Sequence, residues 1–379
     1  MVSFQPTDEE QAFFRLAKDF AVKQIRPEAG KCEQQRAVSG PVAQKAEALG
    51  FCALELPESH GGMELALISQ VFILQALSFG DLGIVQGLPG AGDAASLIRL
   101  APEKPVWAAG KKPGKPLQTV AFVDTQNAGK TGSGLQISRD GPGIALDGET
   151  HPVRLAQTAA YAAIGIEDEN GEFAILWLDQ KDWAVKEGDY RLGLLAAGLG
   201  RLAFDHLHPD ETQVVARGEE ARKLWAKALN RIRVLQAAKA VGAMEAALAY
   251  TVEYTAGRKA FGREIAKFQG VSFTVSDMAF ETAASRNLVY QAAVKVEESP
   301  EDEEGYSLRA LYRAHRALRF VTGQAVQMLG GHGYVQDYPV EKWMRDAQAQ
   351  TMLYDREKAL LQQRGTLILN MLQEGAAGK

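Results

Sequence analysis

The 379-residue chain lacks the features of several common protein classes. It has only two cysteines, Cys32 and Cys52, which form no CxxC pair, and no cysteine–histidine cluster has the spacing of metal ligands. A disulfide-stapled scaffold is therefore excluded, no metal site is expected, and a reduced cytoplasmic setting is the simplest expectation. The formal net charge is −5, so no basic excess favours binding to nucleic acid or to an anionic membrane.

Long apolar runs are also missing. No stretch reaches the roughly 20 apolar residues that a membrane-spanning helix needs. Residues 1–10 are acidic and lack the basic start and apolar centre of a secretory signal, so we expect neither a signal peptide nor a membrane span. What remains is an ordinary globular composition, with 46% hydrophobic and 23% charged residues, at a length that predicts two or three packed substructures.

The hydrophobic pattern divides the chain into three regions. Residues 1–101 have apolar residues at helical spacing, and we expect the first helix to end at Pro27. Residues 102–217 contain short β-rich runs between turn formers. Residues 218–379 have long, regular apolar stripes. The predicted fold is α+β and mainly α: an N-terminal helical domain, a middle β-barrel-like domain and a C-terminal four-helix bundle. The β-rich runs are 119–123, 143–146, 161–166, 173–178 and 201–204.

One informative segment is residues 257–269, Gly-Arg-Lys-Ala-Phe-Gly-Arg-Glu-Ile-Ala-Lys-Phe-Gln. The guanidinium of Arg258 is a rigid fork suited to a pyrophosphate. Gly262 allows the backbone to turn sharply, and the amide of Gln269 can pair with a nucleotide edge. The spacing favours a nucleotide-facing turn over a surface arginine that merely lies beside a turn.

A second informative segment is residues 327–334, Gln-Met-Leu-Gly-Gly-His-Gly-Tyr, followed by Asp-Tyr-Pro-Val-Glu-Lys-Trp-Met-Arg-Asp-Ala at 337–347. Gly330 and Gly331 remove side chains where a backbone must approach a ligand closely. Gln327 adds a polar edge. The Gly-Gly pair alone would be a weak signal, but the residues behind it make the pattern specific.

These two segments, the Pro-Glu-Ser-His-Gly-Gly loop at 57–62 and the order of the three regions resemble the acyl-CoA dehydrogenase family. The resemblance implies FAD as cofactor, α,β-dehydrogenation of an acyl-CoA thioester in lipid metabolism, an electron-transfer flavoprotein as acceptor, and a tetramer whose subunits share their FAD sites. It also implies that Arg233 contacts the CoA part of the substrate. The implied FAD contacts, made to the cofactor of a neighbouring subunit, are Arg258, Phe261, Phe268, Gln269, Gln327, Met328, Leu329, Gly330 and Gly331.

The family reaction also needs a carboxylate that removes the α-proton while a hydride passes to the flavin. In most members this glutamate lies in a Tyr-Glu-Gly-Thr loop shortly after Arg-Asp-Ala. Here a count from Ala347 puts Tyr354 at that position, and a one-residue insertion puts Asp355 there, so Asp355 is the candidate base. A minority of members carry the base where this chain has Ile232. Arg356 replaces the loop glycine, so we expect a continuous helix through this region.

The β-region departs from the family pattern where the flavin ring would pack. Pro152 occupies the position of a family tryptophan, and Arg154 occupies the position of a family threonine. The histidines are scattered, and His315 is expected on a polar helix face.

Three hypotheses follow from the sequence. The chain is an FAD-dependent acyl-CoA dehydrogenase with an atypical base; or it is a non-catalytic partner subunit that lends its nucleotide-facing residues to a paralogue in a heteromeric acyl-CoA dehydrogenase; or it is a CoA-ester binding protein without a redox role. Because the positions that hold the nucleotide end are kept while those around the reactive ring are lost, we favour activity within an assembly.

Overall fold

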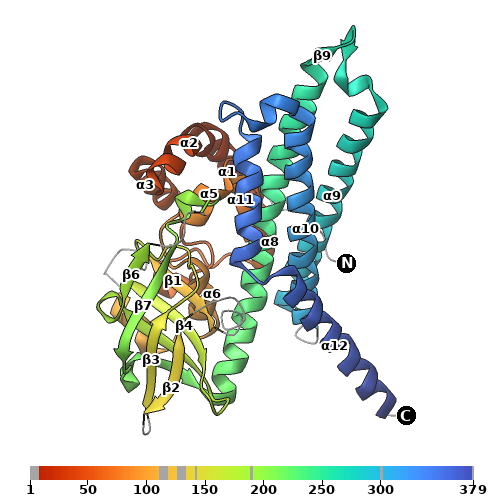
Figure 1. The fold of residues 1–379 in the computed structure, drawn as a ribbon. Coiled ribbons are helices and arrows are strands. Elements are labelled where there is room, and N and C mark those ends of the chain that lie inside the picture. Colours follow the sequence, from red (N-terminus) through yellow and green to blue (C-terminus); the bar gives the residue numbers. More distant parts are fainter. Residues whose placement is uncertain are drawn as a thin grey trace.

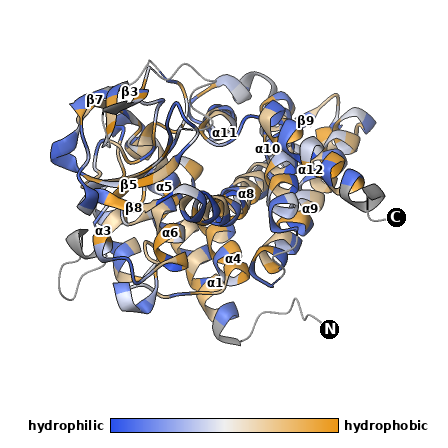
Figure 2. Ribbon diagram, turned by 90° about the horizontal axis from the view of Figure 1, so that it is seen from below, coloured by the Kyte–Doolittle hydropathy of each residue, from blue (hydrophilic) through white to orange (hydrophobic). Residues whose placement is uncertain are grey.

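The computed structural model describes residues 8–110, 118–125, 134–140, 143–187, 191–298 and 302–377. Helices form the first part of the chain, two sheets form the middle, and long helices form the last part (Figure 1). This arrangement confirms the predicted fold class. The sheet region and the long helices lie on opposite sides of α8 (Gly218–Gly257), as the view along the bundle shows (Figure 2).

The N-terminal helices pack around an apolar helix, α4 (Leu67–Ser78), which in turn packs on α8. The expected helix end at Pro27 is wrong. The chain continues from α1 (Asp8–Phe20) through a π-helical turn (Ala21–Ile25) into α2 (Arg26–Gln35). A proline lacks an N–H, but this is tolerated in the first turn of a helix, and the wider π turn directly precedes it. The other helices are α3 (Gly40–Ala48), α5 (Leu82–Gly87) and α6 (Ala95–Leu100).

The middle region consists of two four-stranded sheets. The first has the order β1 (Val120–Asp124), β4 (Tyr161–Glu167), β5 (Phe173–Asp179) and β8 (Val214–Arg217), with β1 and β4 parallel. The second has the order β2 (Gln136–Asp140), β3 (Gly143–Glu149), β7 (Gly200–Leu207) and β6 (Ala184–Glu187), all antiparallel. Each of the five expected β-runs overlaps a strand. The strands β2, β6 and β8 were not expected.

Long helices form the C-terminal region. α8, α9 (Gln269–Glu298) and α10 (Glu303–Leu329) pack side by side, and α11 (Val340–Leu353) and α12 (Glu357–Ala377) follow. A short hairpin of β9 (Lys259–Ala260) and β10 (Arg263–Glu264) joins α8 to α9 at the end of the bundle far from the sheets (Figure 1).

The expected continuous helix after Ala347 is wrong. α11 ends at Leu353, Tyr354 is extended with φ −121° and ψ 142°, and α12 begins at Glu357. The break has a physical reason, because Tyr354 and Asp355 reach different buried partners. Consecutive side chains on a helix are about 100° apart, whereas an extended backbone directs them to opposite sides.

Candidate functional site

Arg233 and Asp355, the candidate CoA contact and the candidate base, face each other inside the chain. The Nε of Arg233 donates to Oδ2 of Asp355 at 2.7 Å, and the two side chains are 7% and 5% exposed. The guanidinium also donates to Gln363 on α12 and to Asn230 on α8. The pair therefore ties α8 to the segment between α11 and α12. In this structure the Asp355 carboxylate is engaged by a cation rather than directed at a cavity.

Tyr354 belongs to a second buried cluster, centred on Asp93. The hydroxyl of Tyr354 donates to Oδ2 of Asp93 at 2.5 Å, and the Nε of Arg154 donates to the same oxygen at 2.8 Å. Arg154 also donates to the carbonyl of Gln86 at 2.8 Å. Its guanidinium lies so close to Gly92, which has φ +55°, that a Cβ there would be 2.7 Å from the Arg154 Nη2. The arginine that replaces the family threonine is thus locked into the N-terminal helices.

Three buried glutamines and one lysine extend this cluster between α5, α8 and α11. Gln236 donates to Asp93 Oδ1 at 2.9 Å. Gln86 donates to Gln236 and to Gln350, at 2.6 and 2.7 Å. The Nζ of Lys239 donates to Oε1 of Gln86 at 3.1 Å. A buried polar network of this kind is stable when its members are satisfied, and it holds the three helices in one arrangement.

The charges in the cluster shift each other's pKa. Burial favours a neutral Asp93, but the charges of Arg154 and Lys239 outweigh it and lower the pKa of Asp93 to about 2. Burial, with the charge of Arg154, lowers the pKa of Lys239 to about 7, although Asp93 opposes the shift. Burial and the neighbouring Asp93 raise the pKa of Tyr354 well above its ordinary value, so its hydroxyl stays protonated and cannot serve as a base near neutral pH.

The interior does not offer the groups that the reactive ring of a flavin would require from this chain. Arg154 is engaged by Asp93 and Gln86, Tyr354 by Asp93, and Ile232, at the alternative base position, is an apolar side chain 1% exposed. All three glutamines of the network, Gln86, Gln236 and Gln350, are completely buried. We therefore derive no proton or hydride step through a flavin held by this chain alone.

The residues that the sequence predicts to face a nucleotide lie elsewhere, at the far end of the bundle. Arg258, Phe261 and Gln269 are exposed, and Phe268 is half-buried. Phe261 is 96% exposed although its φ is +51°, a conformation that costs a bulky residue energy. The ring of Phe268 packs edge-on to Phe261, and the guanidinium of Arg263 lies over it at 4.0 Å. Arg258 and Arg263 are both exposed.

The Gly-Gly segment lies at the same end of the bundle. The hydroxyl of Tyr254, one turn before Arg258 on α8, contacts Nδ1 of His332 at 2.8 Å and the carbonyl of Leu329 at 3.4 Å. The last turns of α8, which lead into the first segment, thus contact the second segment. Of the five expected contacts in this segment, Gln327, Gly330 and Gly331 are exposed, Met328 is half-buried and Leu329 is buried. Leu329, at 3% exposure, is therefore not available to a ligand in this structure.

The chain leaves open space around Gly330 and Gly331. Gly330 has φ +58°, and an added Cβ at Gly330 or Gly331 would meet no heavy atom within 4 Å. Packing inside the chain therefore does not explain why both positions lack a side chain. An exposed backbone without side chains permits the close approach of a ligand such as an adenosine diphosphate group.

Other residues of the signature have structural roles. Lys342 is buried and donates to Asp81 and Asp346, at 2.6 Å each, and Asp346 also accepts from the backbone N–H of Leu194 at 2.6 Å. Arg345 is held by Glu33 and Glu341. This part of the signature fixes α11 against the N-terminal helices and the sheet region.

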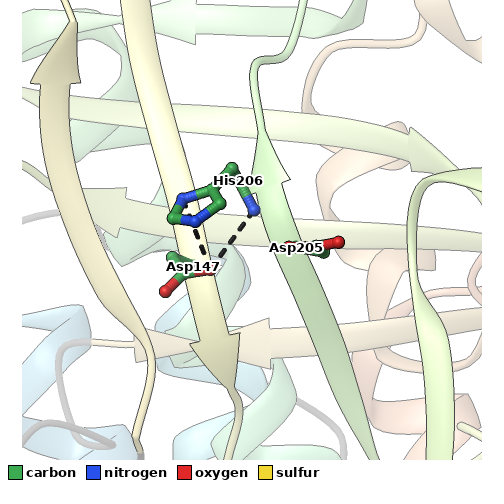
Figure 3. A group of neighbouring side chains, drawn as sticks. All are labelled: Asp147, Asp205 and His206. Carbon is green, nitrogen blue, oxygen red and sulfur yellow. Dashed lines mark hydrogen bonds and ion pairs between the residues drawn. The ribbon is translucent and has the colours of Figure 1, made fainter.

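Within the described residues, one group of side chains has the proximity of metal ligands, namely Asp147, Asp205 and His206 on β3 and β7. Figure 3 shows His206 contacting Asp147, with no interaction drawn to Asp205. The His206 side chain is 79% exposed and that of Asp147 is 42% exposed. An exposed pair of this sort needs no ion, so it gives no support for a metal site.

The expectation for His315 is wrong. Its side chain is fully buried in the bundle, and neither ring nitrogen has a hydrogen-bond partner among the described residues. Burial is the main reason that its pKa falls to about 4. The helix face was misread because α12 packs against α10 and covers what would otherwise be surface.

Comparisons with known proteins agree with this geometry. The acyl-CoA dehydrogenase N-terminal domain model matches residues 7–101, and the acyl-CoA dehydrogenase C-terminal domain model matches residues 223–354. The short-chain specific acyl-CoA dehydrogenase of Megasphaera elsdenii is 27% identical over 376 residues, which cover 93% of this chain and 96% of that protein. An acyl-CoA dehydrogenase of Bacillus subtilis is 26% identical over 360 residues, covering 92% and 94%.

The structural comparison extends over nearly the whole chain. The butyryl-CoA dehydrogenase structure from Megasphaera elsdenii superposes with a TM-score of 0.82 at 25% identity, covering 97% of this chain and 100% of that one. A chain of a structure described as the electron transferring flavoprotein of Acidaminococcus fermentans has the same fold, with a TM-score of 0.84 at 24% identity. The protein belongs to the acyl-CoA dehydrogenase family. Among its described helices, none is long and apolar enough to cross a membrane.

Proposed function

We propose that this chain is a subunit of a heteromeric acyl-CoA dehydrogenase, in which it contributes its nucleotide-facing surface to an FAD whose reactive ring lies in a partner subunit. The partner is a paralogue that carries a complete base loop. The assembly performs the α,β-dehydrogenation of an acyl-CoA thioester and passes electrons to an electron-transfer flavoprotein. The contrast between the exposed Arg258 and Gly331 and the closed cluster around Asp93 is the observation that carries the proposal.

The exposed surface supplies binding groups. Arg258 can pair its guanidinium with pyrophosphate oxygens, and Gln269 and Gln327 can donate or accept at a nucleotide edge. The bare backbone at Gly330 and Gly331 permits close approach. FAD, when bound, supplies the hydride acceptor; this chain binds and orients the nucleotide end.

The interior supports a non-catalytic role for the chain itself. Removing an α-proton requires a base that can reach the substrate. Asp355 is held by Arg233 at 2.7 Å, and Tyr354 at the ungapped position is a hydrogen-bonded phenol. Asp355 stays the candidate base of the alternative in which the lone chain is an enzyme. That alternative requires the Arg233–Asp355 pair to separate when substrate enters.

The test is to purify the chain alone and together with a paralogue that has the Tyr-Glu-Gly-Thr loop, and to count FAD per subunit. We expect flavin only in the co-purified assembly, and bleaching of that flavin by acyl-CoA under anaerobic conditions. Stoichiometric FAD and bleaching in the lone chain would contradict the proposal. In that case Asp355→Asn decides whether Asp355 is the base, because its loss would abolish the bleaching.

A matched pair of variants tests the surface. Arg258→Met in this chain is expected to lower the FAD content of the assembly severalfold. Arg263→Met, in the same hairpin but with its guanidinium over Phe268, should leave the FAD content near the unmodified level. Equal losses in both variants would show that only the net charge of the hairpin matters.

A further inference from the structure

A small cavity lies beside the polar cluster, between α4, α5 and α8. Its volume is about 80 Å³, and its lining includes Cys52, Glu55, Asp93, Arg154 and Lys239. Cys52, Pro89 and Gly92, also in the lining, are partly exposed, so the cavity has a route to solvent. Its walls are largely apolar elsewhere, which keeps the dielectric around its polar groups low.

Two carboxylates and two cations line the cavity, but they do not all pair with one another. Arg154 is paired with Asp93 at 2.8 Å. Glu55 is paired with Arg231 at 2.5 Å and also accepts from Gln70 and Ser96. Burial, with the charge of Glu47, raises the pKa of the Cys52 thiol to about 12, so it is neutral. The positive charge of Lys239 is left without a counterion on this wall.

Lys239 itself is short of acceptors. Its side chain belongs to a residue that is 5% exposed, and its one hydrogen bond to a described residue goes to Oε1 of Gln86. Within the described parts of the chain, no carboxylate oxygen lies within the 4.0 Å of an ion pair. An ammonium carries three donors, and burying one charged without a partner is costly. The ammonium must therefore lose its proton or find further acceptors in the cavity, from water or from an anion.

The size of the cavity limits what that anion can be. One water needs roughly 10–15 Å³ of such space, and a cavity of about 150 Å³ admits benzene. The cavity beside Lys239, at about 80 Å³, is large enough for a molecule of a few heavy atoms and too small for an aromatic or branched acid.

We propose that this cavity is a binding site for a small monocarboxylate of formate or acetate size, held on the ammonium of Lys239 next to the guanidinium of Arg154. The site is separate from the nucleotide-facing surface, and the proposal needs neither flavin nor a partner subunit. Its failure would therefore leave the proposed function untouched, and the reverse also holds.

Binding should depend on pH in a defined direction. The charged groups facing Lys239 are Arg154 and Asp93, with Glu55 and its partner Arg231 across the cavity. In the empty cavity the pKa of Lys239 is about 7. An anion binds the protonated lysine, so binding takes up a proton above this pH. The affinity for the anion should fall about tenfold per unit above pH 7 and level off below it.

The experiment uses the full chain without flavin, titrated with sodium acetate in calorimetry and thermal unfolding. Two compounds control for non-specific effects: acetamide, the neutral analogue of acetate, and sodium gluconate, a carboxylate too large for the cavity. We expect saturable heat and a rise in Tm with acetate only. Lys239→Met should abolish both, whereas Lys223→Met, on the exposed face of the same helix, should leave them unchanged.

A second variant guards against a simple loss of folding in Lys239→Met. Cys52→Met fills part of the cavity and leaves the lysine in place, so it should weaken acetate binding at least severalfold. No acetate binding in the unmodified chain, an equal response to acetamide, or full acetate binding by a folded Lys239→Met variant would each overturn the proposal.

Discussion

The carboxylate of Asp355 and the guanidinium of Arg233 form a buried ion pair, with 2.7 Å between Oδ2 and Nε. This pair joins the one acidic side chain that the sequence offers as a base to the one arginine that it offers as a substrate contact. In the single chain, the charges of Arg233 and Asp355 are therefore paired with each other.

Breaking this pair should destabilise the fold. Arg233→Met or Asp355→Asn leaves a buried charge without its partner, which typically costs ~3–5 kcal/mol. Urea unfolding of both single variants and of the double variant measures the coupling. The exposed pair Arg222–Glu167, whose side chains are 40% and 39% exposed, is the control, and Arg222→Met there should cost less than ~1 kcal/mol. Similar costs in the two pairs would contradict the buried geometry.

Lys239→Met should change how stability depends on alkaline pH. The pKa of Lys239 is about 7 in the folded chain and near 10.5 when exposed. Between these values the unfolded chain holds a proton that the folded chain has lost, so the stability of the unmodified chain rises with pH across this window. The slope is about 1.4 kcal/mol per pH unit at most, and Lys239→Met should lack it. Chemical unfolding in acetate-free buffers from pH 7 to 10 measures the difference. Parallel curves for the two proteins would mean that the lysine keeps its proton.

His315→Met should reduce the loss of stability in acid. The pKa of His315 is lowered to about 4 from 6.5, so the unfolded chain binds an extra proton as pH falls from 6.5 toward 4. Stability that is fully present above pH 6.5 is lost across that window. Replacement by methionine removes this term and two unpartnered ring nitrogens. His206→Gln, at a histidine side chain 79% exposed, is the control and should leave the acid profile unchanged.

The two glycines of the signature should respond differently to alanine. Gly330, with φ +58° and ψ −130°, is in a conformation that costs an L-residue on the order of 1–3 kcal/mol, so Gly330→Ala should lower stability. At Gly331 a Cβ meets no atom of the chain, and Gly331→Ala should change stability by less than ~0.5 kcal/mol while reducing FAD in the assembly. An unchanged FAD content in the assembly with Gly331→Ala would contradict the proposal that the cofactor contacts this backbone.

The order of the three regions could be predicted because apolar periodicity is a local property. The strands β2, β6 and β8, four or five residues long, were not predicted, whereas the equally short β1 was, because the run 119–123 is apolar apart from Thr119. Short segments of this kind carry too few alternations to be distinguished from loops.

Residues of the interior were harder to predict than the surface segments. The sequence shows that Arg154 replaces a threonine, but not that it meets Asp93, 61 positions earlier. Gln86, Gln236 and Gln350 lie in three separate helices, and nothing in the sequence around each of them indicates that they meet. Long-range pairing of this kind depends on how the helices pack, and no local pattern encodes it.

α8 is a single helix of 40 residues, and at about 1.5 Å per residue it spans roughly 60 Å. Its first half carries the polar residues of the interior, and its far end carries the hairpin with Arg258. A neighbouring molecule that contacts only the hairpin depends on where α8 places the hairpin. It does not contact the buried polar residues near the middle of α8. Substitutions in the interior can therefore accumulate without altering the hairpin surface that the neighbour contacts, provided that α8 keeps its shape and position.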